Sequence, residues 1–252
     1  MISLTILIII IILFAVWLIT KQKSINQPSL LIEKEILETH VDFYKNLNLS
    51  GKDIFLNRLR IFLDKVRITG IKTNVEDIDK VLIAAGAIIP IFGFKNWRYK
   101  NINEILLYPN SFGEDFNLEG KNRHTLGMVG NGPYQNVMIL SKEDVRSGFI
   151  NESGESNTTI HEFVHLVDKT DGATDGVPLS LLPYKYSVPW LQLMHEEIKK
   201  IKQGKSDIYA YGATNQAEFF AVVSEYFFKQ PDLMEEKHPE LFNMLKEIFT
   251  SD

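Results

Sequence analysis

Two histidines four positions apart, with a glutamate beside the first, are the residues of this chain best suited to chemistry. They are His161, Glu162 and His165. If the segment is helical, both imidazoles lie on one face and can bind the same metal ion, while Glu162 stands next to the open coordination position. This arrangement is typical of zinc peptidases, in which the glutamate is the general base. The three residues therefore predict a zinc site with hydrolytic chemistry.

The same segment has a second, purely structural interpretation. Thr159 and Glu162 have the spacing of a capping box, so the glutamate could close a helix N-terminus and leave the histidines as ordinary surface residues. A third metal ligand decides between the two interpretations. Because the chain contains no cysteine, that ligand has to be a histidine or a carboxylate.

Carboxylates at two places could complete the metal site. In metzincins the motif continues to a third ligand at the position of Asp171, but here Asp168 replaces the glycine that lets the chain turn back. We favour the other place, residues 209–228, where Glu218 and Glu225 lie a heptad apart on one face of a strongly apolar predicted helix. Buried carboxylates need a partner, and a zinc ion held by two histidines is one. Spacing alone leaves Glu218 and Glu225 as alternatives.

Other residues near these side chains could support the site without binding the metal. Asp168 shares the face of His161 and His165, so it could orient an imidazole without binding the metal; a solvated acid at the helix end is the alternative. Thr214 or Asn215 can cap the helix that carries the glutamates.

Apolar periodicity predicts the elements that must position these side chains. Helices are expected over residues 31–49, 53–68, 75–89 and 189–203, with Pro90 ending the third, and short strands over residues 102–108 and 137–140. The order is helices, a small sheet, then helices again. It predicts a mostly helical α+β fold with segregated layers rather than a βαβ alternation.

The chain begins with an uncharged, apolar run from Ile2 to Ile19. As a helix, this run would reach about 27 Å, which is enough to cross the hydrocarbon core of a bilayer. Lys21 and Lys23 follow it, so the positive-inside rule predicts a single-pass membrane protein whose remaining chain is cytoplasmic. We therefore expect an anchor over residues 1–23 and one domain over residues 24–252.

Several other classes of function lack support in the sequence. A net charge of −5 argues against nucleic-acid binding. No phosphate-binding loop and no Gly-x-Ser-x-Gly elbow is present, which disfavours nucleotide binding and serine hydrolysis. The aspartates of residues 168–178 do not have EF-hand spacing. His124 and His195 are interpreted as ordinary polar residues rather than ligands.

The motifs together resemble the Mlc titration factor A family of zinc-dependent peptidases and, more distantly, the catalytic domain of anthrax lethal factor. The resemblance extends over most of the chain from about residue 31. It is carried by residues 161–165, 171–172, 175–178, 211–221 and 224–228, together with residues 91–94 and 140–145.

The resemblance implies a zincin-like domain with zinc bound by His161, His165 and Glu218, and with Tyr211 facing the substrate. Glu225 is then a supporting residue rather than a ligand. The family also implies a protein partner, a glucose-responsive repressor. We therefore predict a membrane-anchored zinc metallopeptidase acting on a peptide or protein. The alternative is a regulator that sequesters such a partner, with peptidase activity secondary.

Overall fold

A helix that is apolar on every side lies at the centre of the fold. This is α5 (Asp77–Ile88), in which every residue from Val81 to Ile88 is buried. Such a helix is stable only when other elements surround it. A capping box of Glu76 and Asp79 begins it, and the 3-10 helix η1 (Ile89–Ile91), which contains Pro90, follows it. The computed structural model describes residues 28–110, 127–129, 136–150, 156–182 and 184–250.

The strands of the described residues form one four-stranded sheet in the order β1-β2-β4-β3. They are β1 (Arg67–Gly70), β2 (Glu104–Tyr108), β3 (Gly127–Val129) and β4 (Val137–Ser141). β1, β2 and β4 are parallel, whereas β3 runs antiparallel to β4 at the edge. Side chains of β2 and β4, including Ile105 and Met138, are fully buried.

The mostly helical α+β class and the small sheet are as predicted, but the layering is not. The helix predicted over residues 53–68 ends earlier, as α4 (Leu49–Lys65), and β1 begins two residues later. Helical periodicity in α4 runs directly into the β-branched pair Ile68 and Thr69, which hides the boundary in the sequence. Because α5 then connects the parallel strands β1 and β2, one βαβ unit is present, which the predicted segregation of helices and strands did not include.

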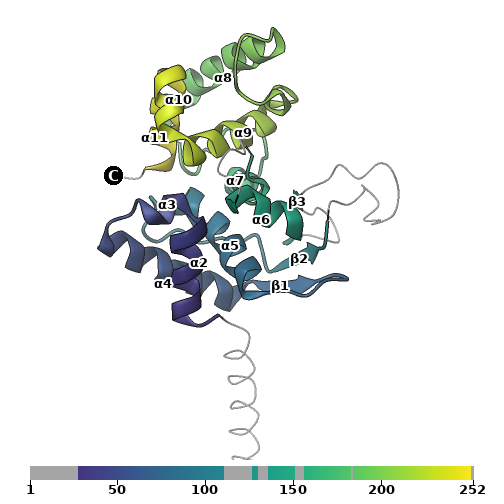
Figure 1. Cartoon of the computed structure of the whole chain (residues 1–252). Coiled ribbons are helices and arrows are strands. Elements are labelled where there is room, and N and C mark those ends of the chain that lie inside the picture. The colour runs from purple at the N-terminus through teal and green to yellow at the C-terminus, as the bar shows by residue number, and fades with distance from the viewer. Residues whose placement is uncertain (1–27, 111–126, 130–135, 151–155, 183, 251–252) are drawn as a thin grey trace, which may run out of the picture.

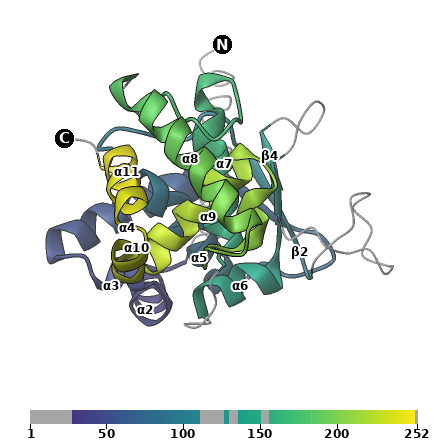
Figure 2. The same cartoon turned by 90° about the horizontal axis from the view of Figure 1, so that it is seen from above.

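The longer helices form two groups with α6 and α7 between them. Below lie α2 (Leu30–His40), α3 (Asp42–Lys45), α4 and α5, and above lie α8 (Ser187–Lys202), α9 (Gln216–Lys229), α10 (Pro231–Lys237) and α11 (Pro239–Phe249) (Figure 1). The first predicted helix is thus split into α2 and α3 at Val41, whose backbone is extended. α6 (Lys142–Ile150) and α7 (Thr158–Asp168) lie in the middle, and α7 runs beside α9 (Figure 2).

Close packing holds α7 against the lower group. The ring of Phe163 meets that of Phe62 edge to face at a centroid distance of 5.6 Å and that of Tyr99 in a tilted contact at 5.2 Å. Asn101 donates a 2.9 Å hydrogen bond to the carbonyl of Leu166. Gly86 of α5 approaches so closely that a Cβ built there would lie 2.4 Å from Cγ2 of Thr159. The position of α7 therefore depends on contacts along its whole buried side.

The predicted anchor and the boundary at residue 23 lie outside the described residues. Of the helices that the structure describes between residues 28 and 250, none is both long and apolar enough to span a membrane.

We expect Gly86→Ala to lower the free energy of unfolding by about 1–3 kcal/mol, because the added methyl group overpacks the contact between α5 and α7. Helix propensity alone would favour alanine over glycine by about 1 kcal/mol. Urea unfolding followed by circular dichroism measures the change. Gly51→Ala in α4, whose added Cβ would have no neighbour closer than 3.3 Å, is the matched control. A Gly86→Ala variant as stable as the wild type would contradict the proposed close contact.

Candidate metal centre

Asn157 begins the helix that carries both histidines. Its Oδ1 accepts a hydrogen bond from the backbone N–H of Ile160, and its Nδ2 donates to the carbonyl of Gly148. Thr159 lies inside α7, so the capping box of Thr159 and Glu162 is not formed. The interpretation of Glu162 as a mere cap is therefore wrong, and its carboxylate is available for another role.

Asn215 fixes the start of α9. Its side chain accepts a hydrogen bond from the backbone N–H of Glu218 at 2.9 Å, so of the two predicted caps it is Asn215 that acts. Glu218 is thereby held in the first turn of α9, immediately after the 3-10 helix η5 (Ala210–Ala213) that contains Tyr211.

Three side-chain atoms converge where α7 and α9 meet. Nε2 of His161 lies 2.9 Å from Oε2 of Glu218 and 3.1 Å from Nε2 of His165, and the remaining pair, Nε2 of His165 and Oε2 of Glu218, is 3.4 Å apart. In a tetrahedral site with bonds of about 2.1 Å, two ligand atoms lie about 3.4 Å apart. The three donors therefore fit a small divalent metal ion.

Glu225, the alternative ligand, contacts the outer side of the same cluster. Its Oε1 lies 2.6 Å from Nδ1 of His161, and its Oε2 accepts a 2.6 Å hydrogen bond from the backbone N–H of Asn157. Because Glu225 engages Nδ1, the Nε2 atom of His161 faces Glu218. A carboxylate in this position sets the tautomer and the ring orientation of a metal-binding histidine.

Hydrogen bonds within the cluster shift the pKa values of His161 and Glu218 in opposite directions. Burial lowers the pKa of His161, but hydrogen bonds with Glu218 and Glu225 outweigh it and raise the pKa to about 10. Burial raises the pKa of Glu218, but hydrogen bonds with His161 and His165 lower it to about 2. Each of these two side chains therefore favours the charged form of the other.

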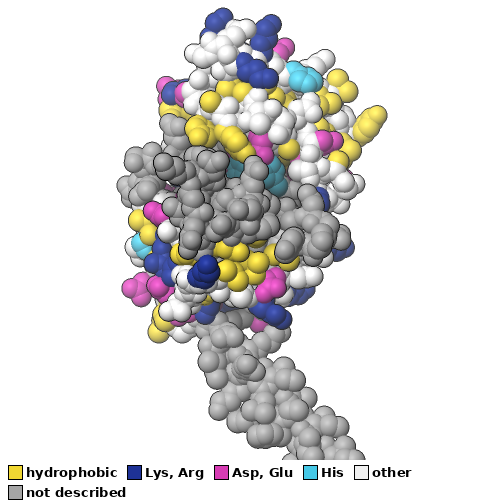
Figure 3. Space-filling view, turned by 90° about the vertical axis from the view of Figure 1, so that its right-hand side faces the viewer, with side chains coloured by type: hydrophobic (Ala, Val, Ile, Leu, Met, Phe, Trp, Pro, Cys, Tyr) yellow, Lys and Arg dark blue, Asp and Glu magenta, His cyan; other side chains and the backbone are white. Residues whose placement is uncertain are grey.

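Glu162 and Tyr211 lie beside the converging atoms. Glu162 is buried and makes no hydrogen bond with another described residue, and burial raises its pKa. Tyr211 is 48% exposed, and its ring centroid lies 6.1 Å from that of His161. Burial, followed by the nearby carboxylates of Glu218 and Glu162, raises the pKa of Tyr211, so its hydroxyl stays protonated. Seen from one side, histidine and acidic side chains reach the surface together among apolar ones (Figure 3).

Two aspartates that the sequence placed near the site have other partners. Asp171 accepts hydrogen bonds from the backbone N–H groups of Ala173 and Leu179, so the metzincin ligand set is not formed. Asp168 is fully buried and accepts from the backbone N–H of Gly176, and the described residues show no hydrogen bond between it and either histidine. Burial raises the pKa of Asp168 to about 7.

The turn that Asp168 holds supports α9. Gly176 has a positive φ of 78°, and a Cβ there would lie 2.3 Å from the carbonyl oxygen of Gln216. Sequence reasoning gave the turn no role beyond ending α7, although the paired Asp-Gly steps in it were visible. His195 is exposed and lies 3.0 Å from the Gln216 amide, away from the cluster, as predicted for an ordinary polar residue. His124 lies outside the described residues.

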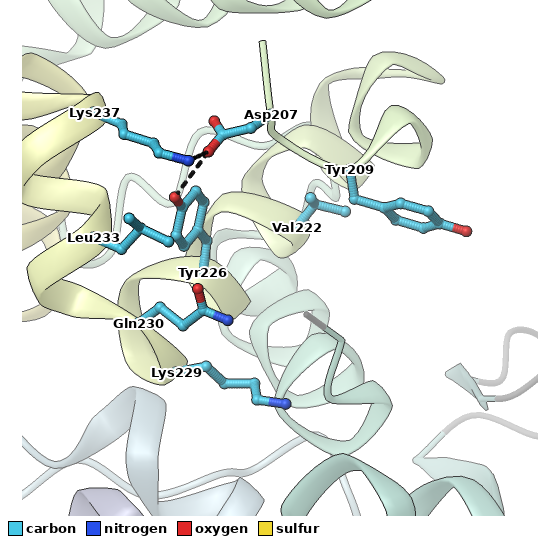
Figure 4. Close-up of a pocket in the computed structure, with 8 residues that line it drawn as sticks. All are labelled: Asp207, Tyr209, Val222, Tyr226, Lys229, Gln230, Leu233 and Lys237. Atoms are coloured by element: carbon cyan, nitrogen blue, oxygen red, sulfur yellow. Dashed lines mark hydrogen bonds and ion pairs between the residues drawn. The ribbon is translucent and has the colours of Figure 1, made fainter. Parts of the chain in front are cut away.

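A second, small pocket of about 120 Å³ is lined in part by Val222 and Tyr226 of α9 (Figure 4). Its charged groups are largely paired. Asp207 contacts Lys237 at 2.6 Å, the Tyr226 hydroxyl at 3.2 Å and His238 at 2.6 Å. These bonds hold the segment leading into η5, and with it Tyr211. No motif in the sequence singled out Asp207.

Comparison with known proteins identifies the class. A family model described as glucose-regulated metallo-peptidase M90 matches residues 17–250. The chain is 30% identical to the Mlc titration factor A of Pectobacterium atrosepticum over 188 residues, which are 70% of this chain and 69% of the relative. For the protein of the same name from Escherichia fergusonii the identity is 28% over 201 residues, 75% of this chain and 74% of the relative. This chain belongs to the glucose-regulated metallo-peptidase M90 family, and the predicted resemblance to Mlc titration factor A is confirmed.

We expect Glu225→Gln to weaken metal binding about 10- to 100-fold, because the neutral amide no longer orients and polarises His161. Competition between the protein and a chromogenic chelator for Zn²⁺ measures the affinity. Glu197→Gln is the matched control, since Glu197 is also buried but pairs with Lys200 on α8. Equal affinities in the Glu225 variant and the wild type would show that Glu225 has no part in positioning the ligand.

Proposed function

We propose that this protein is a zinc-dependent peptidase whose metal ligands are His161, His165 and Glu218. The observation that carries the proposal is the convergence of these three donor atoms beside Glu162, a buried carboxylate without a hydrogen bond among the described residues. Two nitrogens and one oxygen form the ligand set of many catalytic zinc sites, which leaves a fourth position for water or substrate. The absence of cysteine is consistent with such a set.

The residues around the ligands have distinct roles in the proposed hydrolysis. When bound, zinc supplies a Lewis acid and lowers the pKa of a coordinated water toward about 7. Glu162 accepts a proton from the attacking water and delivers it to the leaving amine. Burial raises the pKa of Glu162 above its ordinary value.

Tyr211 is proposed to donate a hydrogen bond to the oxygen that gains negative charge during attack. Its raised pKa keeps the hydroxyl protonated, and its partial exposure lets a substrate reach it. Single donors of this kind contribute about 3 kcal/mol to stabilising the transition state.

The sheet offers a place for an extended substrate. β3 is an edge strand among the described residues, and it packs against α7. A peptide can add to such an edge through main-chain hydrogen bonds. This geometry supports a peptide or protein as the substrate.

For the location of the enzyme, we propose a single-pass membrane protein with the catalytic domain in the cytoplasm. The support is the uncharged run over residues 2–19 and the two lysines that follow it. The family match begins at residue 17, so most of this run precedes the part shared with the family.

A second candidate function is the binding of a regulatory protein, with peptidase activity secondary. It is favoured by the name of the curated relatives, Mlc titration factor A, which refers to a partner called Mlc. If binding is the main function, a Glu162→Gln variant and the protein without metal should both still bind the partner. The peptidase function makes no such prediction.

Glu162→Gln tests the proposed function directly. We expect peptide hydrolysis to fall about 100- to 10,000-fold, as is typical for the loss of a general base. Zinc should stay bound at one ion per chain, because Glu162 is not among the three converging donors. Hydrolysis of a fluorescence-quenched peptide library and metal analysis of the same sample are the readouts. Glu196→Gln, an exposed position on α8, is the control, and undiminished turnover in the Glu162 variant would overturn the proposal.

A further inference from the structure

A cavity of about 390 Å³ lies between α4 and residues 91–103. It is distinct from the metal centre, since none of His161, His165 and Glu218 lines it. Its volume lies within the range of about 300–1,000 Å³ found for small-molecule sites. Neither the family match nor the proposed peptidase chemistry assigns it a role.

The charged residues that line this cavity are all basic. Its lining includes five cations and no acidic residue, although the whole chain has 32 acidic and 27 basic residues. The cations are Arg58, Lys65, Lys95, Arg98 and Lys100. Four of them, all but Arg58, make no hydrogen bond or ion pair with another described residue. So concentrated a positive charge, facing a hollow, attracts anions.

Arg58 shows that the cavity is a formed structure rather than a loose surface. Its guanidinium donates hydrogen bonds to the carbonyls of Ile91 and Phe92, both at 2.9 Å, and to that of Trp97 at 3.3 Å. These bonds fold residues 91–97 onto α4. All three partners are neutral, so the charge of this half-buried cation is not neutralised by a carboxylate of the described chain.

The floor of the cavity is apolar and aromatic. It includes Phe62, Trp97 and Tyr99, and the last two meet edge to face at a centroid distance of 4.7 Å. Phe62 and Tyr99 also contact Phe163, so the floor rests on the buried face of the helix that carries the histidines. A flat apolar body would fit this floor while an attached anionic group met the basic rim.

We propose that this cavity is a binding site for a small organic anion with an apolar or aromatic body and a carboxylate or phosphate group. The basic rim recognises the charge, and the aromatic floor recognises the body. The volume is that of a small-molecule site, whereas an extended polymer would need a longer groove.

The test compares two probes of the same shape and different charge, 1-naphthylacetate and the neutral 1-naphthylacetamide. Isothermal titration calorimetry on the full chain in an uncharged detergent, with a detergent-only blank, measures both affinities. We expect the anion to bind at one site per chain and at least about tenfold more tightly than the amide, as a charge-assisted hydrogen bond allows. Its affinity should fall as salt rises, whereas that of the amide should not.

Charge reversal locates the site. The double variant Arg98→Glu with Lys100→Glu should remove the preference for the anion. A second double variant on the α4 side and the loop, Lys65→Glu with Lys95→Glu, should do the same, so the test survives a folding failure of either one. The matched control is Lys199→Glu with Lys202→Glu, which changes the net charge equally at exposed positions of α8.

Two results would overturn the proposal. One is equal affinity for the naphthyl acid and its amide in the wild type, which would make the cavity a merely apolar hollow. The other is a preference for the anion that persists in a folded pocket variant or disappears in the α8 control. The metal-loading and hydrolysis measurements on Glu162→Gln are independent of both, so failure here leaves the peptidase proposal untouched, and the converse also holds.

Discussion

The contact between α7 and α9 is the constraint on which the proposed activity depends. Two histidines on one helix and a glutamate 53 positions after the second contribute one atom each to a common point. No local interaction can bring them together, because they belong to different helices. The bridge from Glu225 to both His161 and the backbone of Asn157 joins the helices at the site itself. A buried carboxylate is costly unless it is bonded in this way, so the same bonds that position the ligand also stabilise the packing.

Support for the site extends outward from this contact on both sides. Below, Gly86 and the aromatic contacts of Phe163 hold α7 against the centre of the fold. Above, the turn held by Asp168 packs against the start of α9, where Gly176 allows the backbones to meet closely. A metal site requires donor atoms placed within a few tenths of an ångström, and rigid elements provide this better than loops. The surrounding residues therefore help to position the proposed ligands, although they are not among them.

Part of the candidate site could be predicted from local spacing, because His161 and His165 lie one turn apart on a helix. The resemblance to a family predicted Glu218 and Tyr211, and the structure brings both close to the histidines. The apolar periodicity recovered most helices and two strands. It failed at β1, because a short strand that continues a helical pattern has no signal of its own and is defined by its pairing with β2.

The roles of residues outside the ligand set could not be predicted, because they depend on tertiary contacts. Asp168 had the right helical face to orient an imidazole, yet its carboxylate binds the backbone of Gly176 instead. Asp207 gave no signal at all and is defined by partners that lie about twenty to thirty positions away in the sequence. The basic residues within 95–100 likewise could not be assigned to a cavity from the sequence, because the cavity forms only where α4 packs opposite them.

The position of the metal ion tests the central claim most directly. Crystals of the protein grown with zinc and measured at the zinc absorption edge would locate the ion by anomalous scattering. The account predicts one strong peak about 2.0–2.2 Å from Nε2 of His161, Nε2 of His165 and a carboxylate oxygen of Glu218. A peak bound by other residues, or a Glu218 side chain turned away from the histidines in the zinc-bound protein, would contradict it.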